Sequence, residues 1–192
     1  AHVQFYQGDF ASALKKAQAE NKLLMVNFYT DGWSWCKKLD RDVYGDPDVV
    51  KFSDNFINLH IDAEKGEGPE IAKKYYIRGY PTTVFIQPDG EEVDRIIGYT
   101  SADNNLKIMQ DYHAGRHTLK SFLKQLEQNP DDFEIKFKII QKYDDRGGFN
   151  DLIPHAEYII KNDPENKSGL LPKVVFHKAR AEMTLKDDPT VM

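Results

Sequence analysis

The chain has 192 residues, of which 40% are hydrophobic, 12% aromatic and 30% charged, and its formal net charge is −5. This composition is sufficient for a folded core, and the length allows one large domain or two small ones. A negative chain without a basic patch does not favour nucleic-acid binding, and no apolar run approaches the roughly 20 residues that span a bilayer.

The first part of the chain alternates between helical and extended patterns. It begins with an amphipathic helix that has Gly8 and Asp9 as its turn and N-cap. An apolar run follows and has the length of a buried strand. Further along, PDG at 88–90 marks a hairpin turn, and Ser101 and Gly115 bound the last helix of this part. The predicted elements are helices at 9–20, 35–44, 45–56, 67–77 and 101–115, strands at 22–30 and 57–62, and a hairpin at 82–99.

This order of elements predicts an α/β fold. A strand–helix–strand start favours a parallel pair, and the later hairpin adds antiparallel strands. We therefore expect a mixed central sheet with helices on both faces, which is a three-layer sandwich. From residue 118 onward only helical patterns remain, so we expect two domains, 1–117 and 118–192, the second entirely helical.

The stretch FYTDGWSWCK, from Phe28 to Lys37, lies where the first strand leads into the next helix. It resembles the motif of the thioredoxin family, in which two cysteines separated by two residues begin that helix and a lysine follows. Aligned without a gap, Cys36 matches the second cysteine, and Trp33 stands in place of the first, nucleophilic one. The continuation WCKKLD is similar to an extracytoplasmic subgroup of the family.

A second alignment pairs Trp35 and Cys36 with the family's tryptophan–cysteine pair. It makes Cys36 the nucleophile and puts Leu39 in place of its partner, but it needs a gap and loses the match at Lys37. Independent support for the family comes from YYIRGYPTTVFIQPDGE at 75–91, which resembles the thioredoxin stretch that carries a cis-proline, here Pro81.

The missing cysteine limits the chemistry that the resemblance allows. Dithiol exchange needs one thiolate to attack a substrate disulfide and a second thiol to resolve the mixed disulfide, and Cys36 is the only cysteine. The buried acid of many thioredoxins falls at Asn27. Two roles remain open for Cys36: a small buried core residue, or a monothiol that the helix dipole and Lys37 favour as thiolate.

The resemblance also implies a peptide-binding groove beside the motif, because the cis-proline loop of this fold lies against the start of the motif helix. An aromatic groove would bind extended protein segments through apolar burial and backbone hydrogen bonds. Alternatively, Trp33 fills the space beside Cys36. The residues expected on this face are Tyr29, Trp33, Trp35, Tyr80, Pro81 and Thr82.

These features predict a divergent protein of the thiol–disulfide oxidoreductase family that acts on protein substrates, with dithiol activity lost or dependent on a partner. Its catalytic candidates are Cys36 and Trp33, and its partners carry a thiol, a disulfide or an extended apolar segment. The alternative is a non-enzymatic, chaperone-like adapter that uses the same groove. The subgroup implies a periplasmic or otherwise extracytoplasmic location and no cofactor.

His113 and His117 are spaced as a helical metal pair, but Gly115 separates them and no third ligand is near, so no metal site is predicted.

The helical tail resembles a tetratricopeptide repeat. Gly147, Phe149 and NDPEN at 162–166 fall near the repeat's glycine, aromatic and DPxN positions, although Leu152 stands where alanine is usual. Because such repeats bury their faces against neighbours, we expect the tail to dock on the first domain or a partner, or to continue in a longer chain. Its expected role is protein binding or structural capping.

Overall fold

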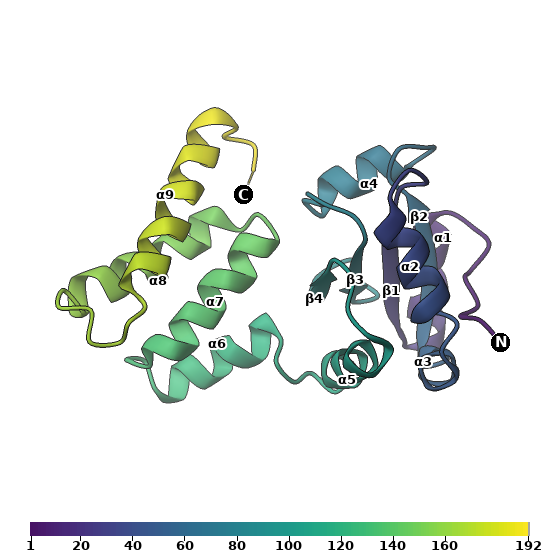
Figure 1. Ribbon diagram of the computed structural model, residues 1–192, viewed down its shortest axis with the longest axis horizontal. Coiled ribbons are helices and arrows are strands. Elements are labelled where there is room, and N and C mark those ends of the chain that lie inside the picture. The colour runs from purple at the N-terminus through teal and green to yellow at the C-terminus, as the bar shows by residue number, and fades with distance from the viewer. Residues whose placement is uncertain (192) are drawn as a thin grey trace. The chain divides into compact units, whose positions relative to one another are not determined.

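The computed structural model describes residues 1–191; residue 192, the end of the predicted second domain, lies outside the described residues. The chain forms two compact units, one over residues 1–116 and one from residue 117 onward. The first contains the sheet and the second consists of helices (Figure 1). Within residues 1–191, no helix combines the length and the apolar character that crossing a membrane requires.

The first unit is a mixed sheet covered by helices, which confirms the predicted α/β sandwich. The strands lie in the order β2-β1-β3-β4, with β1 parallel to β2, and with β3 antiparallel to both β1 and β4. Its elements are α1 (Phe10–Glu20), β1 (Leu23–Tyr29), α2 (Ser34–Asp42), α3 (Pro47–Ser53), β2 (Phe56–Asp62), α4 (Gly68–Lys74), β3 (Thr82–Ile86), β4 (Glu92–Ile97) and α5 (Ala102–His113).

Side-chain alternation along β1 gives this sheet a core on each face. Leu24, Val26 and Phe28 are fully buried on one face with residues of α1 and α4. Met25 faces the other side, where residues of α2, α3 and α5 complete a second core. In Figure 1, α2 lies in front of the strands and α1 behind them. The carboxyl end of β1 therefore leads directly into α2 over one face of the sheet.

The caps predicted for this unit are confirmed. The side chain of Asp9 accepts a hydrogen bond from the Ser12 N–H at the start of α1, and Ser101 accepts one from the Asn104 N–H at the start of α5. Just beyond α5, Gly115 has a φ of 72°, a left-handed conformation that favours glycine. Local sequence chemistry therefore sets these helix ends.

The second unit contains the helices α6 (Leu119–Gln128), α7 (Phe133–Asp145), α8 (Phe149–Asn162) and α9 (Leu171–Asp187). Two glycines form the turn between α7 and α8. Gly147 has a φ of 76°, and a Cβ on Gly148 would lie 2.8 Å from a ring carbon of Tyr143. Both positions therefore require glycine, as the repeat-like pattern predicts for the first of them.

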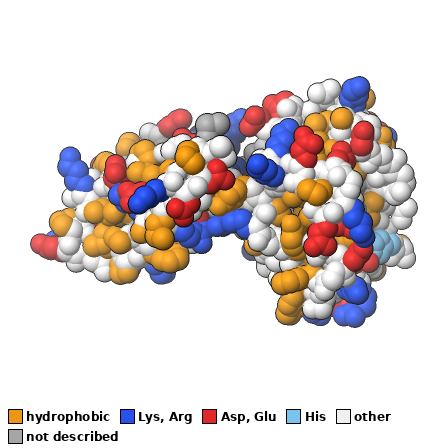
Figure 2. Space-filling view, turned by 90° about the horizontal axis from the view of Figure 1, so that it is seen from above, with side chains coloured by type: hydrophobic (Ala, Val, Ile, Leu, Met, Phe, Trp, Pro, Cys, Tyr) orange, Lys and Arg blue, Asp and Glu red, His pale blue; other side chains and the backbone are white. Residues whose placement is uncertain are grey.

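Buried carboxylates hold the last helix of this unit in place. Asp163 accepts hydrogen bonds from the backbone N–H groups of Lys167 and Ser168, which orders the loop before α9. On α7, Asp144 lies 2.5 Å from the His177 ring through one oxygen and contacts the Arg180 guanidinium through the other. Charged and hydrophobic side chains are interspersed on the face of the helical unit shown at the left of Figure 2.

Candidate functional site

The candidate site begins where β1 ends. The Trp33 N–H donates to the Thr30 carbonyl at 3.3 Å, which closes the turn, and the Cys36 N–H donates to the Trp33 carbonyl at 3.1 Å, which opens α2. Trp33 is the N-cap residue of α2 and provides no side-chain cap bond. The position of the missing cysteine is thus the helix N-cap, and Cys36 lies in the first helical turn.

Cys36 is largely shielded from solvent. Its exposed fraction is 7%, and it is the only cysteine of the chain. Burial raises the pKa of the Cys36 thiol, and a backbone hydrogen bond from Thr30 opposes that shift without overcoming it. The surroundings of Cys36 thus favour its thiol form over the thiolate.

A neutral polar network replaces the acid that many thioredoxins bury near this cysteine. Asn27, 2% exposed, donates from its amide to the Thr83 hydroxyl at 3.1 Å, and that hydroxyl also lies 3.0 Å from the Tyr44 hydroxyl. Burial strongly raises the pKa of Tyr44, and the neighbouring Cys36 contributes in the same direction. None of these three groups accepts a proton near neutral pH, so the network supports packing.

Two tryptophans flank Cys36 on the surface. Trp33 is 53% exposed and Trp35 is 51% exposed. The Trp35 ring lies 5.6 Å from the ring of Tyr99, and the Lys38 ammonium lies 4.8 Å from the centre of that same tyrosine ring. The start of α2 therefore presents an aromatic surface with a cation at its border.

The cis-proline loop completes this region. The Tyr80–Pro81 peptide bond is cis, as the resemblance predicts. The Pro81 carbonyl accepts a hydrogen bond from the Gly98 N–H at 2.8 Å, which ties the loop to the end of β4. Burial, then Glu64 and Cys36, raise the pKa of the half-buried Tyr80.

The predicted site residues differ in their access to solvent. Trp33 and Trp35 are exposed and Tyr80 is half-buried, whereas Pro81 is buried. Thr82 is 2% exposed, and its hydroxyl donates to the Gly79 carbonyl at 2.8 Å, so this side chain stabilises the loop. We name the group formed by Trp33, Trp35, Tyr80 and Tyr99 the aromatic face.

Sequence reasoning missed Tyr99 as a member of the aromatic face. The available signal was the pair Gly98–Tyr99 just before the last helix of the unit. Gly98 has a φ of 79° and binds the Pro81 carbonyl, so the residue after it is held beside the cis-proline loop. The glycine before the last helix of the unit, which resembles the family's glycine, was therefore the signal that the next residue, Tyr99, lies beside the cis-proline loop.

The histidines weighed as a metal pair have other contacts. His113 packs edge-on against the rings of Phe52 and Phe56, with centroid distances of 5.7 Å and 5.4 Å. The other histidine of this pair, His117, lies beyond the end of α5 and has a φ of 56°. In the part of the chain that the structure describes, no three His, Cys, Asp or Glu side chains are grouped to hold a metal ion.

Two curated relatives illustrate the similarity of this chain to known proteins. The Thiol:disulfide interchange protein DsbD of Pseudomonas fluorescens is 27% identical over 99 residues, and Thioredoxin-2 of Pyricularia oryzae is 31% identical over 91 residues. The matches cover 50% and 47% of this chain, but 17% and 47% of those relatives. The chain thus spans less than half the length of either relative.

Solved structures and a family profile agree with these relatives. A putative disulphide-isomerase from Bacteroides thetaiotaomicron is 39% identical with a TM-score of 0.52, over 58% of this chain and 93% of that chain. A thioredoxin from Thermus thermophilus is 29% identical with a TM-score of 0.52, over 58% and 87%. Residues 10–113, more than half of the chain, match the family described as Thioredoxin-like domain. The chain therefore belongs to the thioredoxin-like domain family.

Proposed function

We propose that this protein has lost dithiol exchange and uses its aromatic face to bind extended apolar segments of other proteins. One observation carries the proposal: a half-exposed tryptophan stands at the nucleophile position, while the remaining thiol, Cys36, is 7% exposed and has a raised pKa. Trp33 cannot attack a disulfide, and Cys36 lacks the second thiol that resolves a mixed disulfide. The site therefore has an exposed aromatic face that can bind a protein segment, but it lacks the two thiols that catalytic exchange requires.

The chemistry of the aromatic face favours a protein ligand. Trp33 and Trp35 each leave about half of their surface in water, and burying such rings is a major source of binding energy at protein interfaces. Lys38, above Tyr99, donates to Asp42 at 2.5 Å, and its remaining N–H groups can donate to a carbonyl of the bound segment. The ligand class is thus an unfolded or extended segment with aromatic or aliphatic side chains.

A second candidate is exchange at Cys36 with a thiol supplied by a partner. It is favoured by the location of Cys36 in the first turn of α2, where the helix dipole stabilises a thiolate once the partner has displaced the side chains that shield Cys36.

We further propose, from the subgroup resemblance, that the protein works outside the cytoplasm. The helical region from residue 118 is proposed as a separate protein-binding domain.

Binding of an unfolded client tests the main proposal. The probe is fluorescein-labelled lactalbumin, reduced and carboxymethylated so that it stays unfolded and carries no free thiol, and the readout is fluorescence anisotropy. We expect saturable micromolar binding that weakens at least tenfold when Trp33→Ala and Trp35→Ala are combined. Val175→Ala is the matched control, because Val175 is also about half exposed but belongs to the helical unit.

The thiol variant separates the two candidates. Cys36→Ser should leave client binding unchanged, since the thiol is shielded and does not belong to the aromatic face. Unchanged binding after both tryptophan substitutions would contradict the proposal. Client release or transfer that requires Cys36 would support partner-dependent exchange in its place.

A further inference from the structure

Helix α9 of the helical unit carries two apolar faces, only one of which is covered. Val174 and Ala181, two turns apart, are fully buried within the unit. Phe176 and Met183, also two turns apart, are 60% and 66% exposed. An isolated exposed side chain is ordinary, but two large ones on the same stripe of one helix form a surface that another molecule can cover.

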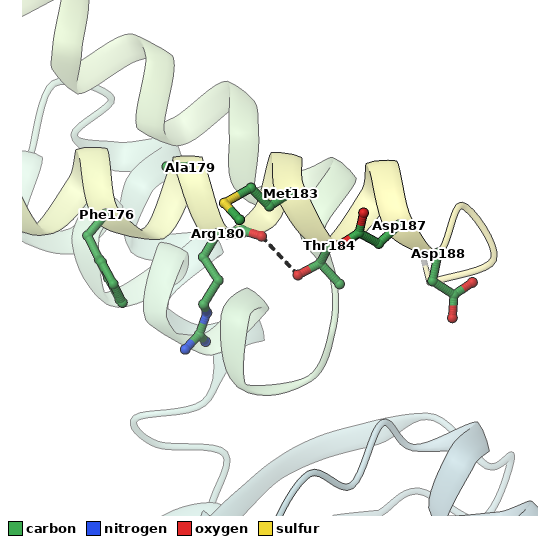
Figure 3. Close-up of a pocket in the computed structure, with 7 residues that line it drawn as sticks. All are labelled: Phe176, Ala179, Arg180, Met183, Thr184, Asp187 and Asp188. Carbon is green, nitrogen blue, oxygen red and sulfur yellow. Dashed lines mark hydrogen bonds between the residues drawn. The ribbon is translucent and has the colours of Figure 1, made fainter.

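The exposed stripe is a groove between two rows of side chains (Figure 3). Both rows advance by four residues at a time. Phe176, Arg180, Thr184 and Asp188 form one row, and Ala179, Met183 and Asp187 form the other. Helices pack by inserting a row of this spacing into such a groove, which gives crossing angles near −50°. The shape therefore suits a second helix better than a small molecule.

The groove is complementary to itself. The small Ala179 lies near its middle and allows close approach of another backbone, and Phe176 and Met183 lie on either side of that point. A two-fold axis through the middle of the groove, with the helices antiparallel, brings Phe176 of one copy beside Met183 of the other. Thioether–aromatic contacts of this kind are favourable, and an interface across a two-fold axis uses the same patch twice.

The charges at the two ends of α9 fit the same arrangement. Lys173 lies one turn before Phe176, with its ammonium 5.9 Å from the centre of the Phe137 ring, and Asp187 lies one turn after Met183; both side chains are exposed. In an antiparallel pair, Lys173 of each copy approaches Asp187 of the other. The charge of Arg180, near the axis, is already matched by Asp144 on α7.

We propose that the exposed groove of α9 binds α9 of a second copy of this chain, antiparallel, in a two-fold homodimer. A single helix pair buries less than the roughly 1,200–2,000 Å² of a standard stable interface. The dimer is therefore weak, with dissociation constants of about 10–200 μM.

Sedimentation velocity of the full chain from about 5 to 500 μM tests this proposal. A reducing agent is present, so that no disulfide between Cys36 residues contributes. We expect a monomer at the low end and a dimer at the high end. Phe176→Glu and Met183→Glu should each weaken dimerisation at least tenfold with unchanged circular dichroism. Ile97→Glu is the matched control, because Ile97 is 51% exposed but belongs to the first unit.

Charge reversal tests the antiparallel arrangement itself. Lys173→Glu and Asp187→Lys should each weaken the dimer, and the double variant should restore it. A monomer throughout the concentration range, or a dimer that tolerates Phe176→Glu and Met183→Glu, would overturn the proposal. Failure of the double reversal to restore the dimer would overturn the antiparallel pairing. None of these results depends on client binding by the aromatic face.

Discussion

At the scale of single residues, Trp33 and Cys36 determine what this member of the thioredoxin-like family can do. Trp33 occupies the N-cap of α2, and Cys36 lies three residues later in the first turn. Around them, the bond before Pro81 is cis and the Gly98 N–H binds the Pro81 carbonyl, whereas Asn27 stands in place of the acid that many thioredoxins bury. Under the proposed function, dithiol exchange is lost because a tryptophan stands at the position of the first motif cysteine.

Restoring a thiol at that position should therefore restore exchange. In Trp33→Cys the new thiol would lie exposed at the helix N-terminus, where the dipole favours thiolate, with Cys36 available to resolve the mixed disulfide. We expect insulin reduction in the presence of dithiothreitol to accelerate at least tenfold over the natural chain. Trp33→Ser is the control and should give no acceleration. A folded Trp33→Cys protein without activity would show that more than one thiol has been lost.

The sequence predicted part of this residue-scale description. The sequence shows that Asn27 stands where many thioredoxins have a buried acid, but it does not show which groups form hydrogen bonds with the Asn27 amide. Thr83 and Tyr44 lie far from Asn27 in the chain and meet it only through strand pairing and packing of the residues after α2. Tyr99 escaped prediction for the same reason, since its contact with Trp35 depends on the tertiary fold.

At the scale of elements, a buried ionic cluster joins α7 to α9. Burial alone would raise the pKa of Asp144, but hydrogen bonds from His177 and Arg180 outweigh it and lower this pKa overall. The side chain of Asp144 is 3% exposed, so removing its charge leaves the Arg180 guanidinium without its carboxylate partner and weakens the hydrogen bond with His177. The cluster, together with the ordered loop around Asp163, fixes α9 on the unit.

Asp144→Asn should destabilise the helical unit by about 2–4 kcal/mol at pH 7. Because the folded pKa of Asp144 lies below its unfolded value of about 3.9, its stabilisation is present above that pH and is lost as the pH falls through the folded pKa. Denaturant titrations of the full chain should therefore show a difference that shrinks below pH 4. Asp151→Asn, at an exposed position on α8, is the control. A difference that does not change with pH would contradict this assignment.

The order of elements followed from the sequence because caps, turns and apolar periodicity are local signals. The hairpin around PDG and the double-glycine turn at 147–148 are examples. The two faces of α9 were not predicted, since the sequence alone does not show which apolar side chains of this helix its neighbours cover. The exposed face emerges only from three-dimensional packing.

At the scale of the whole molecule, the chain combines a thioredoxin-like unit with a helical unit, each with its own buried residues. Two blocks of sequence, around Cys36 and around Pro81, were enough to predict the fold of the first, because those residues serve the local geometry of the motif turn and the cis-proline loop. The aromatic face and the groove of α9 provide one proposed binding surface on each unit. These two surfaces are the basis of the proposal that the protein acts as an adapter.

The measurement that tests this account most directly is the alkylation rate of Cys36 in the folded full chain, followed by intact-mass spectrometry between pH 5 and 10. The account predicts slow labelling, with a midpoint above the value of about 8.5 for an unperturbed cysteine, and a large acceleration in denaturant. Rapid labelling of the folded protein with a midpoint well below that value would identify a poised thiolate, and would contradict the claim that the protein binds without exchanging thiols.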